Sequence, residues 1–320
     1  MTARKDNIVL ECRWVSHHFG PKRVLHNISF QVERGQIIAL VGRSGCGKST
    51  LLRAMLGTYP ARGGEVVHTH LDGRVEVVIA PNQDRGIVFQ DNCLYPFLTA
   101  LGNVAYGLKI SQTSIPHRMF RPVVWRRQRR RHLASARTLL REFSLEEAAD
   151  CYPRQLSGGM QRRVAIARAM IMQPEVVFLD EPFTGLDEET NYRLQRFLLR
   201  LNLKAKQEQG SFAGVTMVIV THELNAGLTV ADRVIGLSQY WDWKAAGFET
   251  CPGATIVYDK PASVYGPDDT VNIADLETQK REIEDAVSSP EFRESRERFR
   301  REWSVVREQQ PTGALSGVRE

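Results

Sequence analysis

One glycine-rich segment combines the residue types needed to hold a phosphate group. Residues 42–50 read Gly-Arg-Ser-Gly-Cys-Gly-Lys-Ser-Thr, which matches G-x-x-x-x-G-K-[ST]. Glycines let backbone N–H groups turn towards an anion, because no Cβ stands in the way. We expect Lys48 to reach the β- and γ-phosphates of a nucleotide, and Ser49 to place its hydroxyl on Mg²⁺. The alternative is a glycine-rich turn that merely ends a strand, and the Lys-Ser pair argues against it.

The segments on either side of this loop fit the same interpretation. The apolar residues 37–41 predict a buried strand, and residues 51–55 predict a helix. A helix that begins at the loop contributes free N–H donors and the positive end of its dipole. The residues predicted here to bind the nucleotide are Gly42, Ser44, Gly45, Cys46, Gly47, Lys48, Ser49 and Thr50.

Two adjacent carboxylates follow a second apolar strand, predicted over residues 176–180. In open α/β sheets, ligands bind at the carboxyl ends of the strands. We therefore expect Asp180 to hold Mg²⁺, directly or through water, and Glu181 to polarise a water molecule for attack on the γ-phosphate. An acidic turn after a strand is the alternative.

A second segment suited to anions opens another predicted helix. Residues 156–161 read Leu-Ser-Gly-Gly-Met-Gln. Ser157 is a favourable helix cap, and the two glycines expose backbone N–H groups. A chain that binds one nucleotide does not need two such sites. The simplest interpretation is that this segment serves a nucleotide held by another copy of the chain.

With this segment, the sequence resembles the ATP-binding cassette (ABC) family over about residues 8–240. Residues 42–50 resemble its Walker A loop, residues 176–181 its Walker B strand with the following glutamate, and residues 156–161 its signature. The remaining matches are Gln90 with the Q-loop glutamine, Leu186-Asp187 with the end of the D-loop, His222 with the switch histidine, and Phe19 with the aromatic residue that stacks on adenine. Taken alone, His222 reads as an ordinary strand-end histidine and Phe19 as a packing residue.

The resemblance implies a fold, and the order of the elements agrees with it. Alternating apolar strands and amphipathic helices predict a mostly parallel sheet with helices on both faces. The family adds an antiparallel β subdomain and a helical subdomain, here at about residues 91–165. We predict an α/β P-loop NTPase domain over residues 1–240, and a mostly helical C-terminal extension with a disordered tail over 241–320.

The resemblance also implies residue roles with ATP and Mg²⁺. The implied catalytic residues are Glu181 as general base, His222, Gln90 and Lys48. The implied metal-binding residues are Ser49, Gln90 and Asp180. Ser157, Gly158, Gly159 and Asp187 would contribute to nucleotide binding across a dimer of two cassettes, and Phe19 would stack on the base.

Composition restricts the function further. The chain has 320 residues, 42% hydrophobic and 25% charged, which is ordinary for a globular protein. Its net charge of +6 does not by itself indicate nucleic acid binding, because the excess is concentrated in the arginine-rich segment 121–131. Either that segment is a solvated helix face, or it contacts a permease or anionic lipid. The five scattered cysteines predict neither disulfides nor a metal site. No apolar run is long enough to cross a bilayer.

Within the family, residues 86–108 resemble importer ATPases, and most closely the nitrate/sulfonate/taurine/bicarbonate group. The implied partners are a second ATP-binding cassette, transmembrane permease subunits contacted through residues 91–106 and, indirectly, a substrate-binding protein. We expect the second cassette to be another copy of this chain, and the sequence leaves open a different one. The implied location is the cytoplasmic face of the inner membrane, as a peripheral subunit. Thr184-Gly185 departs from the group's usual pattern. The alternatives are a soluble ABC ATPase not tied to transport, and an exporter cassette. The sequence does not name the transported solute.

Overall fold

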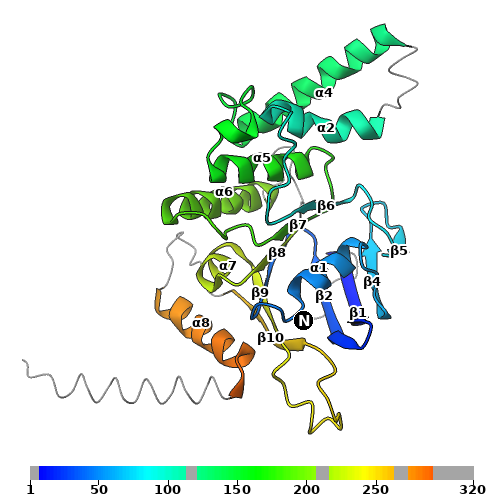
Figure 1. Cartoon of the computed structure of the whole chain (residues 1–320), viewed down its shortest axis with the longest axis vertical. Helices are drawn as coiled ribbons and strands as arrows, with labels where there is room; N and C mark the ends of the chain where they lie inside the picture. Colours follow the sequence, from blue (N-terminus) through cyan, green and yellow to red (C-terminus); the bar gives the residue numbers. More distant parts are fainter. Residues whose placement is uncertain (1–6, 113–120, 207–215, 263–272, 291–320) are drawn as a thin grey trace, which may run out of the picture.

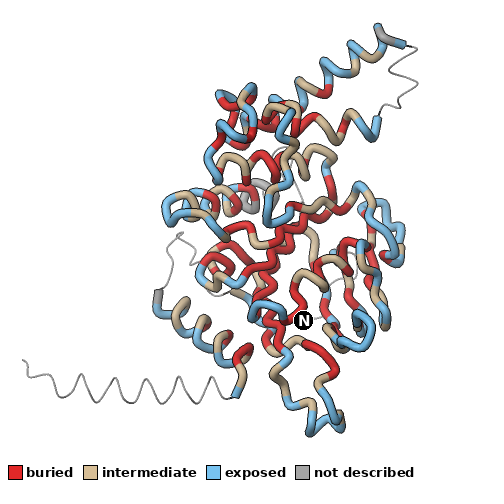
Figure 2. Tube along the Cα trace, viewed as in Figure 1, coloured by how far each residue is buried: buried red, intermediate tan, exposed pale blue. Residues whose placement is uncertain are grey.

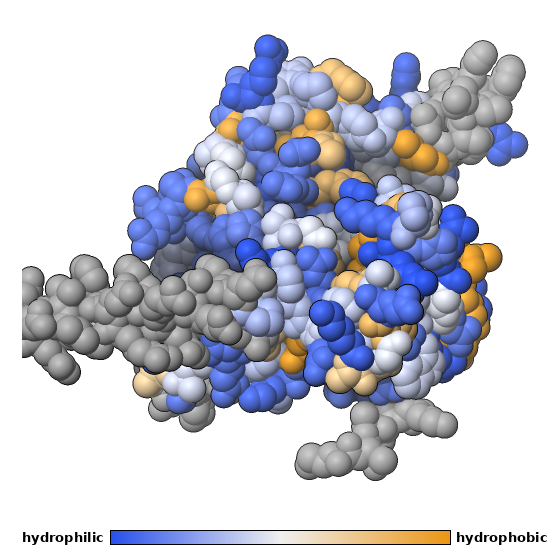
Figure 3. Space-filling view, turned by 60° about the horizontal axis from the view of Figure 1, so that its bottom comes forward, coloured by the Kyte–Doolittle hydropathy of each residue, from blue (hydrophilic) through white to orange (hydrophobic). Residues whose placement is uncertain are grey.

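The computed structural model describes residues 7–112, 121–206, 216–262 and 273–290. The predicted disordered tail, and part of the helical extension predicted after residue 240, lie outside these residues. Among the described helices, none is both long and apolar enough to cross a membrane. The face drawn in Figure 3 is mostly hydrophilic, and its apolar residues gather in small separate groups.

A mostly parallel central sheet confirms the predicted core. Its strand order is β10-β9-β3-β8-β7-β6, and only β10 runs antiparallel, against β9. The strands are β3 (Ile37–Val41), β6 (Arg85–Val88), β7 (Val176–Asp180), β8 (Thr216–Thr221), β9 (Arg233–Ser238) and β10 (Thr255–Pro261). In Figure 1 this sheet runs through the middle of the molecule, between the helices above and the smaller sheet on the right.

Both faces of the central sheet are buried, because alternate side chains of each strand enter two different cores. In β3, Ile37 and Val41 pack into a cluster with the helices. Ile38 and Leu40 pack into a second cluster with α1 (Lys48–Leu56) and the smaller sheet. Continuous apolar strands of this kind are typical of parallel sheets covered on both sides. Figure 2 shows the buried residues concentrated in this central layer.

The smaller sheet is antiparallel, with strand order β2-β1-β4-β5. Its strands are β1 (Ile8–Phe19), β2 (Lys22–Glu33), β4 (Gly63–Thr69) and β5 (Val75–Val77). The first two strands form a long hairpin. Its turn lies at Gly20-Pro21, because His18 and Phe19 still pair with β2.

Helices α5 (Gly158–Met170), α6 (Glu188–Lys206), α7 (Leu224–Val230) and α8 (Ile273–Val287) cover the other face of the central sheet. The helices α2 (Ala100–Gln112) and α4 (Pro122–Glu142) pack against each other and on α5, further from the sheet (Figure 1). Beyond residue 240, β10 forms the edge of the central sheet, and α8 packs on the core through Ile283 and Val287. The proposed domain division at residue 240 stays a prediction.

A buried charged network joins the two sheets at the amino ends of the central strands. Arg34 Nη1 donates to Glu175 Oε2 (2.7 Å). Arg85 Nη1 lies 2.8 Å from His68 Nδ1 and 3.1 Å from Glu76 Oε1. Because an arginine only donates, His68 Nδ1 is the acceptor. Burial, with the positive charges of His70 and Arg85, lowers the pKa of His68 from 6.5 to about 4.

Candidate active site

The phosphate loop lies between β3 and α1, where close backbone contacts require glycine. Gly42 has φ +154, and a Cβ added there would lie 2.4 Å from the carbonyl oxygen of Leu237 in β9. Gly47, with φ +104, is the residue before α1 and has no side-chain cap. The first N–H groups of α1 therefore have no competing side-chain acceptor.

The two polar residues that open α1 point to opposite parts of the site. Lys48 is buried, and its Nζ donates to the carbonyls of Gly42 (2.8 Å) and Arg43 (3.2 Å). Ser49 Oγ donates to Asp180 Oδ1 at 3.1 Å. These residues come from distant parts of the chain, and the parallel pairing of the strands brings them together at the carboxyl edge of the sheet.

Asp180 is the last residue of β7 and has an exposed fraction of 9%. Burial raises the pKa of its carboxyl group. The hydrogen bond from Ser49 opposes this effect, and the charge of Glu181 adds to it. A hydroxyl and a carboxylate at one point form an oxygen donor set of the kind Mg²⁺ prefers. The predicted pair Ser49–Asp180 thus fits that ion.

Glu181 adopts a left-handed backbone conformation, with φ +50, which turns the chain out of β7. Its Oε2 is 2.9 Å from His222 Nδ1 and accepts hydrogen bonds from the His222 backbone N–H (3.3 Å) and the Thr184 hydroxyl (3.2 Å). The Glu181 side chain is 14% exposed and that of His222 is 53% exposed. A carboxylate beside a histidine at the mouth of a pocket is suited to handling a proton.

A pocket of about 330 Å³ opens over the start of α1. Its lining includes Phe19 and Gln90 with Glu181. From the loop it includes Ser44, Gly45, Gly47, Lys48, Ser49 and Thr50. Gly42 and Cys46 do not line it. Lys22 and Val24 also line the pocket, and the sequence did not identify them, because β2 reaches the loop only through the folded hairpin.

The second predicted anion site lies elsewhere. Ser157 caps α5 by accepting a hydrogen bond from the Met160 backbone N–H (3.3 Å). A Cβ added at Gly159 would lie 2.3 Å from Thr190 Cγ2, so α5 begins directly against α6. Asp187 caps that neighbouring helix by accepting from the Thr190 N–H (2.9 Å). None of Ser157, Gly158, Gly159 and Asp187 lines the pocket over α1.

Arginines of α5 connect it to the segment that follows β6. Arg162 donates to the carbonyls of Phe89 (2.9 Å) and Glu181 (3.4 Å). Arg168 donates to the carbonyls of Cys93 (2.6 Å) and Asn92 (3.0 Å). Gln90 is therefore flanked by residues whose backbone is attached to α5.

A buried asparagine holds the next part of the segment. Asn103 is fully buried, and its amide bonds the backbone of Tyr95, Leu98 and Thr99 at 2.8–3.1 Å. Phe97 remains 68% exposed on the loop thus formed. A fixed loop with an exposed aromatic residue offers a rigid contact surface.

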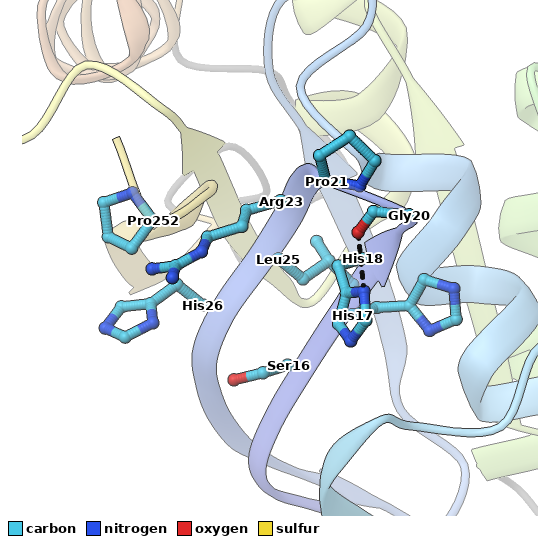
Figure 4. A pocket seen from close by; sticks show the side chains of 9 residues that line it. All are labelled: Ser16, His17, His18, Gly20, Pro21, Arg23, Leu25, His26 and Pro252. Atoms are coloured by element: carbon cyan, nitrogen blue, oxygen red, sulfur yellow. Dashed lines mark hydrogen bonds between the residues drawn. The ribbon is translucent and has the colours of Figure 1, made fainter. Parts of the chain in front are cut away.

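A larger cavity, of about 480 Å³, lies beside the β1–β2 hairpin, with Arg23, His26 and Pro252 in its wall (Figure 4). His18 also lines it, and its Nδ1–H donates to the Gly20 carbonyl at 3.0 Å. No residue of the phosphate loop lines this cavity. The nucleotide site is therefore assigned to the smaller pocket, where loop, carboxylates and glutamine converge.

Known proteins support this assignment. A dimeric ATP-binding cassette solved in a post-hydrolysis state, bound to ADP and Pi, matches with a TM-score of 0.57 at 25% identity, covering 80% of this chain and 100% of the other. The sulfate/thiosulfate import ATP-binding protein CysA of Bordetella parapertussis is 38% identical over 259 residues, 80% of this chain but 66% of that protein. The glutamine transport ATP-binding protein GlnQ of Escherichia coli is 38% identical over 231 residues, 71% of this chain and 86% of that protein.

Fold and site together define an ATP-binding cassette. The ABC transporter family matches residues 25–184, and the chain belongs to that family, in which this domain is an ATPase. The relatives carry names for sulfate/thiosulfate and glutamine. They support an importer subunit without singling out the nitrate/sulfonate/taurine/bicarbonate group.

Proposed function

We propose that this chain is the ATP-hydrolysing subunit of a membrane importer for a small solute, an anion or a small organic compound. The names of the relatives support import. The likeness of residues 86–108 to the nitrate/sulfonate/taurine/bicarbonate group is the only argument for that finer assignment. The observation that carries the proposal is the convergence of Glu181, His222 and Gln90 around the phosphate loop.

In this proposal, the pocket over α1 binds ATP. The N–H groups of residues 44–50 surround the phosphates, and Lys48 exchanges its bonds with the loop carbonyls for bonds with the nucleotide. Phe19 stacks on the base from the rim of the pocket. Ser49, Asp180 and Gln90 hold Mg²⁺, which neutralises charge on the phosphates when bound.

Glu181 acts as general base towards the attacking water. Its carboxylate is 2.9 Å from His222 Nδ1, so His222 orients Glu181 and faces the γ-phosphate with its other nitrogen. The left-handed turn at Glu181 directs the carboxylate towards the pocket rather than along the strand. General base catalysis of this kind contributes about 10²–10⁴-fold to a rate.

The second half of each site comes from another copy of the chain. Ser157, Gly158 and Gly159 of one copy contact the γ-phosphate held by its partner copy, with Asp187 beside them. Two cassettes therefore close around two ATP molecules. ATP favours the closed dimer and ADP does not, which turns hydrolysis into a conformational change.

The conformational change that follows hydrolysis is transmitted to the membrane through residues 91–106, which contact transmembrane permease subunits. The exposed Phe97 on a loop held by Asn103 supports this surface. A separate binding protein delivers the solute to the permease. The chain then works as a peripheral subunit at the cytoplasmic face of the inner membrane, and no nucleic acid takes part.

The substitution Glu181→Gln tests the catalytic assignment. We expect ATP binding to persist, a stable dimer to accumulate, and turnover to fall by about 10²–10⁴-fold. Glu223→Gln is the matched control, because that carboxylate directly follows His222 in the chain but accepts a hydrogen bond from Asn191 (2.9 Å). Normal turnover in Glu181→Gln would show that Glu181 is not the base.

The import assignment is tested by purifying the tagged chain from membranes. If the chain is an importer subunit, a permease with several membrane spans should be among the proteins that copurify with it.

A further inference from the structure

The amino-terminal half of α4 is a basic surface that the catalytic proposal does not use. Over residues 92–141 the sequence contains no Asp or Glu. The basic residues in this range are Lys109, Arg118, Arg121, Arg126, Arg127, Arg129, Arg130, Arg131, Arg137 and Arg141. Six of them fall between residues 121 and 131, about 15 Å of helix at the usual rise.

The two halves of α4 differ in burial. Ala136, Leu139 and Leu140 in the second half are buried in the main core. In the first half, all five arginines from Arg126 to Arg131 are exposed. In Figure 1 this half extends away from the central sheet, at the upper edge of the molecule. Packing therefore holds the second half, and the first half is presented to the surroundings.

These arginines are not arranged to stabilise the protein itself. No ion pair joins any of the five to a carboxylate within the described part of the chain, whereas Arg137 and Arg141, further along the helix, pair with Asp150 and Glu146. Arg121, the residue before α4, also places a positive charge at the helix N-terminus, where it opposes the helix dipole. The first turn of α4 contains no acidic residue to compensate. A concentration of charge that costs stability is best explained by an anionic partner.

Apolar side chains lie on the same surface. Val123 is 76% exposed and Val124 43% exposed. Val123 precedes Arg126 by three residues and Arg127 by four, which places the three side chains on one face of the helix. A helix that combines exposed arginines with apolar residues suits the boundary between lipid headgroups and acyl chains.

We propose that the first half of α4, residues 121–131, docks on the anionic headgroups of a membrane surface. This inference rests on the proposed function, which puts the chain beside a membrane. The arginines bind the lipid phosphates, and Val123 with Val124 enters the headgroup layer. Each basic residue close to an anionic surface strengthens binding about fivefold. The contact weakens with added salt, because the charges are exposed.

Vesicle flotation with the purified full chain, without nucleotide, tests the proposal. The probes are vesicles of phosphatidylcholine alone, and of two parts phosphatidylcholine to one part phosphatidylglycerol. We expect binding to the anionic vesicles only. The double variant Arg126→Gln/Arg130→Gln should weaken it about thirtyfold. Glutamine keeps the helix-forming tendency, and retained ATP binding would show that the variant is folded.

The matched control is Arg196→Gln/Arg200→Gln, which removes the same charge from the exposed face of α6 and should change binding less than about twofold. Equal binding to both kinds of vesicle, or equal losses in the two double variants, would overturn the proposal. So would binding that requires permease in the vesicles whatever their lipid charge, because the surface would then contact the permease. A chain that binds anionic vesicles but hydrolyses no ATP would refute the proposed function alone.

Discussion

The two edges of the central sheet contain similar charged residues, but the environments of these residues differ. At the amino edge, the half-buried Arg34 pairs with Glu175 at 2.7 Å, and the buried Arg85 pairs with Glu76 at 3.1 Å. At the carboxyl edge, Lys48 bonds the backbone carbonyls of Gly42 and Arg43, and Glu181, which contacts His222, lines a pocket. Charged residues therefore do not identify a site by type alone. At one edge they pair with each other and join two sheets, and at the other they face the space where a substrate fits.

This comparison predicts a division of effects. Changes at the carboxyl edge should reduce turnover and leave stability nearly unchanged. Changes at the amino edge should reduce stability and leave the turnover of folded molecules unchanged.

The largest effect is expected from separating the two halves of the composite site. Lys48→Ala removes the lysine of the phosphate loop, and Ser157→Arg blocks the tip of α5. Each variant alone should lose at least about 10²-fold in turnover. Mixing the two should restore part of the activity, because a mixed dimer contains one site with both halves intact. ATPase assays over a range of mixing ratios measure this. A mixture no more active than its components would contradict the shared site.

At the amino edge, Arg34→Leu should lower the free energy of unfolding by about 3 kcal/mol, because it leaves the buried carboxylate of Glu175 without its cation. Denaturant unfolding measures this loss. Arg141→Leu is the control, since its pair with Glu146 is exposed and such pairs contribute about 1 kcal/mol or less. If Arg34→Leu abolished turnover in a molecule of normal stability, the two edges would not differ as described.

The smallest effect is a dependence of stability on pH. The pKa of His68 is about 4 in the folded chain, against 6.5 ordinarily. Above pH 6.5 both states are neutral at this residue, so it contributes no slope. As the pH falls towards 4, the unfolded state takes up a proton first, and stability declines by at most about 3 kcal/mol. His68→Asn keeps an acceptor for Arg85 and should flatten the slope between pH 6.5 and 5.

Local signals allowed the phosphate loop, the carboxylates after β7 and the central strands β3 and β7 to be predicted. Each depends on neighbouring residues, such as the glycines of residues 42–47 or the apolar run before Asp180. The amino-edge network could not be predicted, because Arg34 and Glu175 are 141 residues apart and meet only after both sheets form. Helix α7 was missed because it has seven residues, which is too short for a clear periodicity. The roles assigned to the site residues stay predictions.

One feature of α5 has a thermodynamic consequence. This helix begins at the Ser157 cap, and its Arg162 and Arg168 hold the backbone at Phe89, Asn92 and Cys93. A helix of 13 residues moves as a stiff rod of about 20 Å. A movement of the segment after β6 would then tilt the amino end of α5, and a force on that end would be transmitted back to the segment. Because of thermodynamic linkage, the coupling between the two ends of α5 has the same size in both directions. Under the proposed function, solute binding to the permease would therefore change the affinity for the nucleotide by the same factor with which nucleotide binding changes the affinity for the solute.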